Sequence, residues 1–158
     1  MAGRAGYFDV FASFWSSRAE VKKIWFSLFT PQVGAADEEL LAPSEREEVL
    51  NVLSSLRAKF PKVYLPDAVL QGLRRPPRAP DECIFARTTA SFTADLKSHI
   101  TPCQFGGTPD CTQCGCFASA GLKAVGDKRL LGFVPVHSLY RASDAVGKAA
   151  ARMFRDAA

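Results

Sequence analysis

The sequence predicts an α/β fold for the first 75 residues, followed by a small cysteine-rich α+β part that contains a β-hairpin. Two observations support this division. Helix-like and strand-like hydrophobic patterns alternate up to residue 75, which is typical of βα units around a parallel sheet. Beyond residue 82 this alternation stops, and all five cysteines of the chain lie in that second part.

The chain is expected to begin with a helix and a strand. Apolar residues recur at roughly helical spacing over residues 6–20 and predict a helix that ends near Arg18. Residues 24–29, Ile-Trp-Phe-Ser-Leu-Phe, are dense in aromatic and β-branched side chains and are followed by Thr30 and Pro31. Such a run is typical of a strand that is covered on both faces.

A loop then leads to a second helix, a short strand and a third helix. Ser44 and Glu47 have the spacing of a capping box, and an apolar face continues from there to Lys59. Residues 62–65 can return as a short strand, and a short helix follows Pro66. These units are too few to close an eight-stranded barrel, which needs about 250 residues.

A stretch rich in arginine and proline separates the two parts. We place the first part at 1–75, the linker at 76–82 and the second part at 83–158. In the second part, residues 91–94 and 98–101 predict a hairpin that leads into a loop rich in Gly, Pro and Cys. The remaining predicted elements are a helix over 117–125, a strand over 130–136 and a helix over 144–154 capped by Ser143.

Composition narrows the class of protein. With 47% hydrophobic and 23% charged residues, the chain has the composition of a globular domain. A net charge of +4, without a concentrated basic stripe, argues against a nucleic-acid partner. No run approaches the 18 or so apolar residues of a membrane span, and the start lacks the apolar region of a signal peptide, so we expect a cytoplasmic protein.

The cysteines are the strongest functional signal. An odd number of cysteines without an export signal fits metal or redox chemistry better than a disulfide framework. Thiolates bind both zinc and iron–sulfur clusters, but structural zinc sites usually use two Cys-x2-Cys pairs separated by a longer spacer. Here a single such pair is crowded by a further cysteine, which favours an iron–sulfur cluster. The five candidate ligands are Cys83, Cys103, Cys111, Cys114 and Cys116.

The cysteine region resembles the SPASM-type auxiliary domain of radical S-adenosylmethionine (radical SAM) enzymes. The matching residues are the stretch from Ser91 to Gly107, which contains Pro102-Cys103, with Cys83 upstream and the residues 111–116 downstream. In that family a cysteine precedes a β-hairpin and a Pro-Cys pair follows it. Residues 24–32 and the helices beside them look like late βα units of the partial barrel in the same enzymes. The resemblance covers roughly residues 7 to 147.

Two departures limit what the resemblance implies. These enzymes bind their catalytic [4Fe–4S] cluster through a Cys-x3-Cys-x2-Cys motif, and no cysteine precedes Cys83 here. We therefore expect that the chain alone does not cleave S-adenosylmethionine, which would be a cofactor only of an intact enzyme. The full SPASM pattern serves two clusters with seven cysteines, whereas five suffice for one auxiliary [4Fe–4S] cluster. The resemblance implies that Cys83 and Cys103 are ligands, with two more from Cys111, Cys114 and Cys116.

Several roles follow from one such cluster. It can transfer single electrons, bind a substrate atom directly through an open iron position, or staple a loop-rich segment. The expected partner is an upstream radical SAM half or a separate catalytic chain that docks on an exposed sheet edge; neither the substrate nor the reaction follows from the sequence. The rival hypothesis is a non-catalytic, zinc-stabilised protein-interaction module.

Other polar residues are weaker candidates for a functional site. Ser27, Thr30 and Gln32 lie at the end of the expected strand, where α/β barrels place substrate and cofactor contacts, although polar residues also occur where a strand simply leaves a core. His99 precedes Cys103 by four positions, but a solvent-facing strand residue explains it better than a metal ligand. Asp110 is best explained by turn formation.

Overall fold

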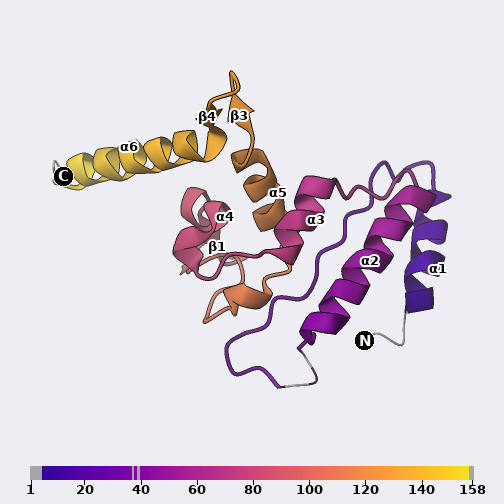
Figure 1. Cartoon of the computed structure of the whole chain (residues 1–158). Coiled ribbons are helices and arrows are strands. Elements are labelled where there is room, and N and C mark those ends of the chain that lie inside the picture. The colour runs from indigo at the N-terminus through magenta and orange to yellow at the C-terminus, as the bar shows by residue number, and fades with distance from the viewer. Residues whose placement is uncertain (1–4, 37, 39, 157–158) are drawn as a thin grey trace.

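The computed structural model describes residues 5–36, 38 and 40–156. Its helices and strands follow one another along the chain as shown in Figure 1. They are α1 (Ala5–Ser16), α2 (Pro43–Lys59), α3 (Asp67–Arg74), the 3-10 helix η3 (Pro80–Glu82), α4 (Ile84–Thr88), β1 (Ser91–Phe92), β2 (His99–Ile100), the 3-10 helix η4 (Cys111–Gln113), α5 (Phe117–Gly126), β3 (Arg129–Leu130), β4 (Val134–Pro135) and α6 (Val136–Asp156).

The expected α/β fold with a partial barrel is wrong. The chain is 52% helical, and its described residues form only two antiparallel sheets of two strands each. The expected strands over 24–29 and 62–65 meet in a single parallel bridge between Ile24 and Val63. Two hydrogen bonds hold that bridge, from Ile24 N to Lys62 O at 2.8 Å and from Tyr64 N to Ile24 O at 2.9 Å.

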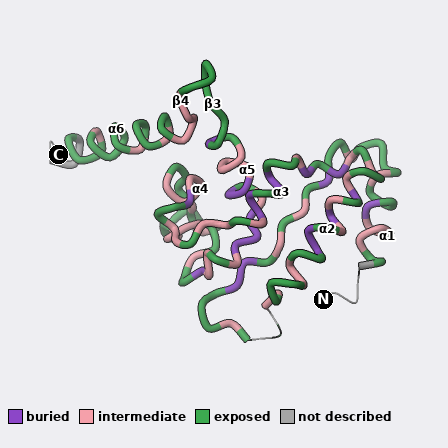
Figure 2. Tube along the Cα trace, in the orientation of Figure 1, coloured by how far each residue is buried: buried purple, intermediate pink, exposed green. Residues whose placement is uncertain are grey.

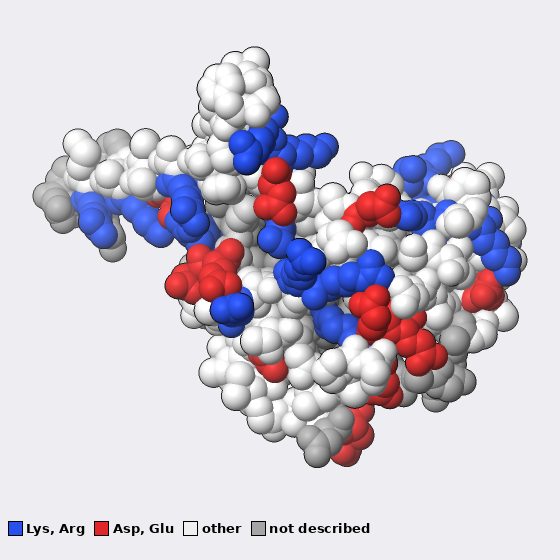
Figure 3. All heavy atoms as spheres, in the orientation of Figure 1, with Lys and Arg blue, Asp and Glu red and all other residues white. Residues whose placement is uncertain are grey.

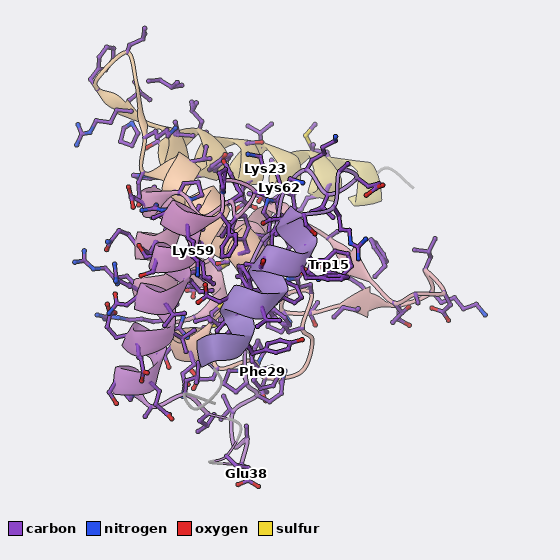
Figure 4. All side chains as sticks on the ribbon, turned by 90° about the vertical axis from the view of Figure 1, so that its right-hand side faces the viewer. Trp15, Lys23, Phe29, Glu38, Lys59 and Lys62 are labelled. Carbon is purple, nitrogen blue, oxygen red and sulfur yellow. The ribbon has the colours of Figure 1, made fainter. Side chains whose placement is uncertain are left out.

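Long-range contacts explain why residues 24–29 form no sheet. Beyond the bridge the segment turns to the cysteine region, where Leu28 N donates to Gly115 O at 3.0 Å. It is not covered on both faces, because Trp25 and Phe29 remain 65% and 58% exposed. Figure 4 shows the side of the molecule with α1 in front, where Phe29 lies at the surface. The strand that the aromatic run predicted is therefore absent apart from the bridge at Ile24.

The core is built mainly from α2, α3 and the segments beside them. Apolar side chains recur on α2 at helical spacing and are buried as the sequence predicted. The largest fully buried side chains are Leu50, Leu53, Leu65 and Leu73. Figure 2 shows this buried trace running along α2 and into α3 and α5. The partly buried rings of Phe8, Phe11 and Phe26 pack against the same core.

The start of α2 differs from the predicted capping box. The helix begins at Pro43, and the Glu45 carboxylate accepts a hydrogen bond from Ala42 N at 2.9 Å. Ser44 therefore lies in the first turn and Glu47 just beyond it, and neither residue caps the helix. Pro43 explains the shift, because its fixed φ suits the first position of a helix and its missing N–H costs nothing there.

The two parts of the chain pack directly on each other through α3 and α5. Gly72 lies so close to Ala120 that a Cβ on Gly72 would stand 3.0 Å from the Ala120 Cα, Cβ and O. A glycine is therefore needed for this helix crossing. The contact fixes the cysteine region, which immediately precedes α5, against the helices of the first part.

The second part contains two hairpins and a long terminal helix. The predicted hairpin is confirmed but short, with Ser91 opposite Ile100 and Phe92 opposite His99. The expected strand over 130–136 is wrong, since a turn at Gly132, with φ of 80°, splits it into β3 and β4. The last helix begins at Val136, well before the predicted cap at Ser143.

The surface carries charges of both signs. Figure 3 shows basic and acidic side chains interspersed over the body, with mostly basic side chains along α6, which projects from it. Among the described residues, no helix is long and apolar enough to cross a membrane.

Candidate metal centre

All five cysteines of the chain line one cavity, although they are spread along the sequence from residue 83 to residue 116. None of them forms a disulfide. Three are nearly inaccessible to solvent, with Cys83 8% exposed, Cys114 9% and Cys116 6%. The other two cysteines in the cavity wall are Cys103 and Cys111. The rest of the wall consists of Thr30, Pro77, Pro80, Phe85, Ala86, Phe105, Pro109 and Ser119.

Different elements present these thiols. Cys83 joins η3 to α4, and Cys103 follows the β1–β2 hairpin. Cys111 begins η4, and Cys114 is the residue at which it ends. Cys116 caps the N-terminus of α5, where its sulfur accepts from Ser119 N at 3.4 Å. Short elements with sharp turns between them thus bring five separate positions to one place.

Hydrogen-bond donors surround the sulfurs. The Cys116 sulfur also accepts from Gln104 Nε2 at 3.2 Å, and the Cys83 sulfur lies 3.1 Å from Ser119 Oγ. Thr30 Oγ1 donates to the Cys114 sulfur at 3.9 Å. Donors of this kind stabilise thiolates and tune metal–sulfur centres.

Three of the thiols have pKa values above the ordinary value for cysteine. Burial raises the pKa of Cys103, Cys111 and Cys116, and that of Cys111 reaches about 11. Neighbouring cysteines raise these pKa values further, because thiolates that share a cavity repel each other. A metal that binds here must therefore displace protons, as is usual for thiolate sites.

The side chains of the cavity have the chemistry of a metal–sulfur centre, but their positions are not those of metal ligands. The titratable groups on the cavity wall are thiols only, with no histidine or carboxylate among them. Over the described ranges, no three His, Cys, Asp or Glu side chains stand in an arrangement that could hold a single metal ion. The donor set is therefore that of a soft, thiolate-binding centre whose sulfurs must shift when the group binds.

Ser27, Thr30 and Gln32 all contact the cysteine region. Ser27 Oγ accepts from Phe117 N at 3.3 Å, and Thr30 Oγ1 accepts from Gly115 N at 3.0 Å. Gln32 Oε1 accepts from Thr108 N at 2.7 Å. Of the three, only Thr30 lines the cavity. In this structure they bind backbone groups that would otherwise lack a partner, and so hold the loop in place.

The remaining sequence candidates lie outside the cavity. His99 is exposed on β2 beside the ring of Phe92, with 5.3 Å between ring centroids. Asp110 Oδ1 accepts from Thr112 N at 3.0 Å, which confirms its role in turn formation. The second histidine of the chain, His137, lines a neighbouring cavity of about 280 Å³ between α4, α5 and α6. This cavity shares Cys83 and Ser119 with the cysteine cavity.

Sequence reasoning missed the residues that support the cysteines from a distance. Ser119 and Gln104 contact the sulfurs, and Arg46 reaches the cysteine loop from α2. Gly115 allows the closest backbone approach, since a Cβ there would lie 2.2 Å from Leu28 O. The sequence holds no signal for Arg46, whereas Gly115 belongs to the glycine-containing loop that the sequence predicted to fold closely around a bound group.

The comparisons with known proteins give no family. The chain matches no protein-family model, no curated protein and no solved structure.

Proposed function

We propose that the chain binds one [4Fe–4S] cluster through four of its five cysteines. The observation that carries this proposal is the convergence of all five thiols on one largely buried cavity that offers no other ionisable ligand. Five thiols in one apolar enclosure without disulfides are the donor set expected of a metal–sulfur centre.

The cysteine loop supports an auxiliary rather than a catalytic role. A cluster held here would supply one-electron transfer or an iron position for a substrate atom. The likeness to SPASM domains concerns the hairpin and the cysteines, and the β1–β2 hairpin and the cavity lined by five cysteines support this part of the proposal. On this proposal the chain works with a separate catalytic half of a radical SAM enzyme that binds and cleaves S-adenosylmethionine.

The chain's own residues have distinct tasks in this proposal. Thr30, Gln104 and Ser119 place O–H and N–H donors beside the sulfurs, which favours the thiolate forms when the cluster binds. The apolar wall excludes water, and Phe85 and Phe105 belong to it. The cavity that contains His137 adjoins Cys83 and offers space for a ligand beside the cluster.

The test is metal analysis of protein purified without oxygen. We expect about four irons and four acid-labile sulfides per chain and a brown colour that bleaches on addition of dithionite. One zinc per chain without sulfide contradicts the cluster and supports the zinc-stabilised interaction module. Protein with neither metal nor sulfide, even after anaerobic reconstitution with iron and sulfide, contradicts both hypotheses.

A further inference from the structure

Arg46 connects α2 to the cysteine loop through three backbone carbonyls. Its Nη1 donates to Gln113 O at 3.1 Å, and its Nη2 donates to Cys114 O and to Leu73 O, both at 2.7 Å. The guanidinium is half-buried between α2, the end of α3 and η4. Its Nε is buried and has no hydrogen-bond partner in the described part of the chain.

This placement is costly and therefore informative. The guanidinium is partly withdrawn from water, and burial disfavours its charge. A neutral donor would satisfy the same carbonyls without the cost of burying a charge. A half-buried cation beside a cysteine loop is favourable when the loop holds a negatively charged group.

We propose that Arg46 is a positioning residue that fixes the loop at Cys114 and raises the reduction potential of the bound cluster. This inference rests on the proposed function. Reduction adds one electron and hence one negative charge to a cluster bound by thiolates. A fixed positive charge beside one ligand stabilises the reduced state more than the oxidised state.

Arg57 provides a matched control on the same helix. Its Nη1 donates to a backbone carbonyl, Leu65 O, at 2.8 Å and also pairs with Asp67 at 2.7 Å. The contact resembles that of Arg46, but it involves no residue of the cysteine cavity. Arg57→Gln therefore removes a guanidinium from α2 and a carbonyl contact without changing the charge next to the thiols.

The test compares full-length wild type, Arg46→Gln, Arg46→Lys and Arg57→Gln in a dithionite titration followed by the visible spectrum. At the potential that half-reduces the wild type, we expect the ratio of reduced to oxidised cluster to fall about tenfold in Arg46→Gln. In Arg46→Lys, which retains the charge, we expect it to stay within about threefold of the wild type. Arg57→Gln should match the wild type.

Each other outcome overturns a specific claim. An unchanged ratio in Arg46→Gln with a full complement of iron overturns this inference alone, as does an equal fall in Arg57→Gln. If Arg46→Gln does not retain the cluster, the test rests on Arg46→Lys. A tenfold fall in the ratio of reduced to oxidised cluster in that variant overturns the role of the charge. A wild type without iron and sulfide overturns the proposed function and this inference together.

Discussion

A cysteine ligand can be distinguished from a spare cysteine by removing each thiol in turn. We expect four of the five Cys→Ser variants to lower bound iron more than about tenfold, because losing a ligand costs at least as much as losing a residue that supports one. The fifth variant should keep iron and sulfide near the wild-type amount and serves as the control for handling and folding. Iron and sulfide per chain give the result. The series covers Cys83, Cys103, Cys111, Cys114 and Cys116.

If all five variants retain iron at the wild-type amount, the thiols are not the ligands. Loss in all five variants would show instead that the fifth cysteine is needed for the cavity itself.

Gly115 is the residue at which the cysteine loop approaches the first part most closely. In Gly115→Ala the new Cβ would lie 2.2 Å from Leu28 O and 2.4 Å from Leu28 C, so backbone must move. We expect the free energy of unfolding to fall by at least about 2 kcal/mol and bound iron to decrease, since the hydrogen bonds of Leu28 and Thr30 lie at this contact. Denaturant unfolding and iron analysis provide the measurements.

Gly121→Ala is the matched control for that substitution. Gly121 lies on α5, and a Cβ there meets nothing within 4 Å. We expect a gain of about 0.5–1 kcal/mol, because alanine favours a helix interior over glycine. If both alanine variants have the same stability, the close approach at Gly115 is not a constraint on the fold.

At the scale of elements, α6 is attached to the body through an ion pair. The Asp144 carboxylate accepts from Arg87 Nη2 of α4 at 2.8 Å and from Lys148 at 2.9 Å. These contacts, with that of Arg87 the stronger, lower the pKa of Asp144. Asp144 therefore stabilises the docked helix at pH values above the unfolded-state pKa of the carboxyl group, and this contribution disappears as the pH falls through the lowered pKa.

Asp144→Asn tests this pH dependence. We expect the wild type to be more stable than the variant at about pH 6, with the difference shrinking between about pH 4 and pH 2 as the carboxylate is protonated. Urea unfolding at a series of pH values measures both proteins, and acid effects on the cysteine region cancel in the comparison. A stability difference that stays constant across this range would show that the carboxylate does not contribute through its charge.

At the scale of the whole molecule, the cysteine cavity joins parts that are distant in the chain. Thr30 and Arg46 come from the first part, and α5 begins directly after the last cysteine. A bound metal centre would therefore stabilise the region from Cys83 to α5 most directly, while most of the leucine core lies on α2 and α3.

Removing the metal should expose this difference. We expect backbone amide exchange over residues 103–116 to accelerate more than about tenfold after iron removal by a chelator under anaerobic conditions, because metal binding supplies folding free energy to a loop-rich segment. Amides of α2 should exchange at nearly the same rate in both forms. Hydrogen exchange followed by mass spectrometry gives the comparison. Equal acceleration throughout the chain would indicate one cooperative unit, contrary to this expectation.

Local patterns in the sequence determined much of this protein. Helical periodicity located α1, α2, α3 and α5, because those helices satisfy their own backbone hydrogen bonds and only need one apolar face. The β1–β2 hairpin was also found, since its strands are close in the chain. The density of cysteines over residues 83–116 was enough by itself to identify the candidate site.

The tertiary structure decided how extended segments were paired and which residues reached the cysteines. Residues 24–29 have the pattern of a sheet strand, but an extended segment takes its hydrogen bonds from whatever backbone lies beside it, and here that includes Gly115. Arg46 has no sequence signal, because its partners are backbone carbonyls that any residue could supply. Side-chain identity is encoded locally, whereas these partners are fixed only when α2, α3 and the cysteine loop pack together.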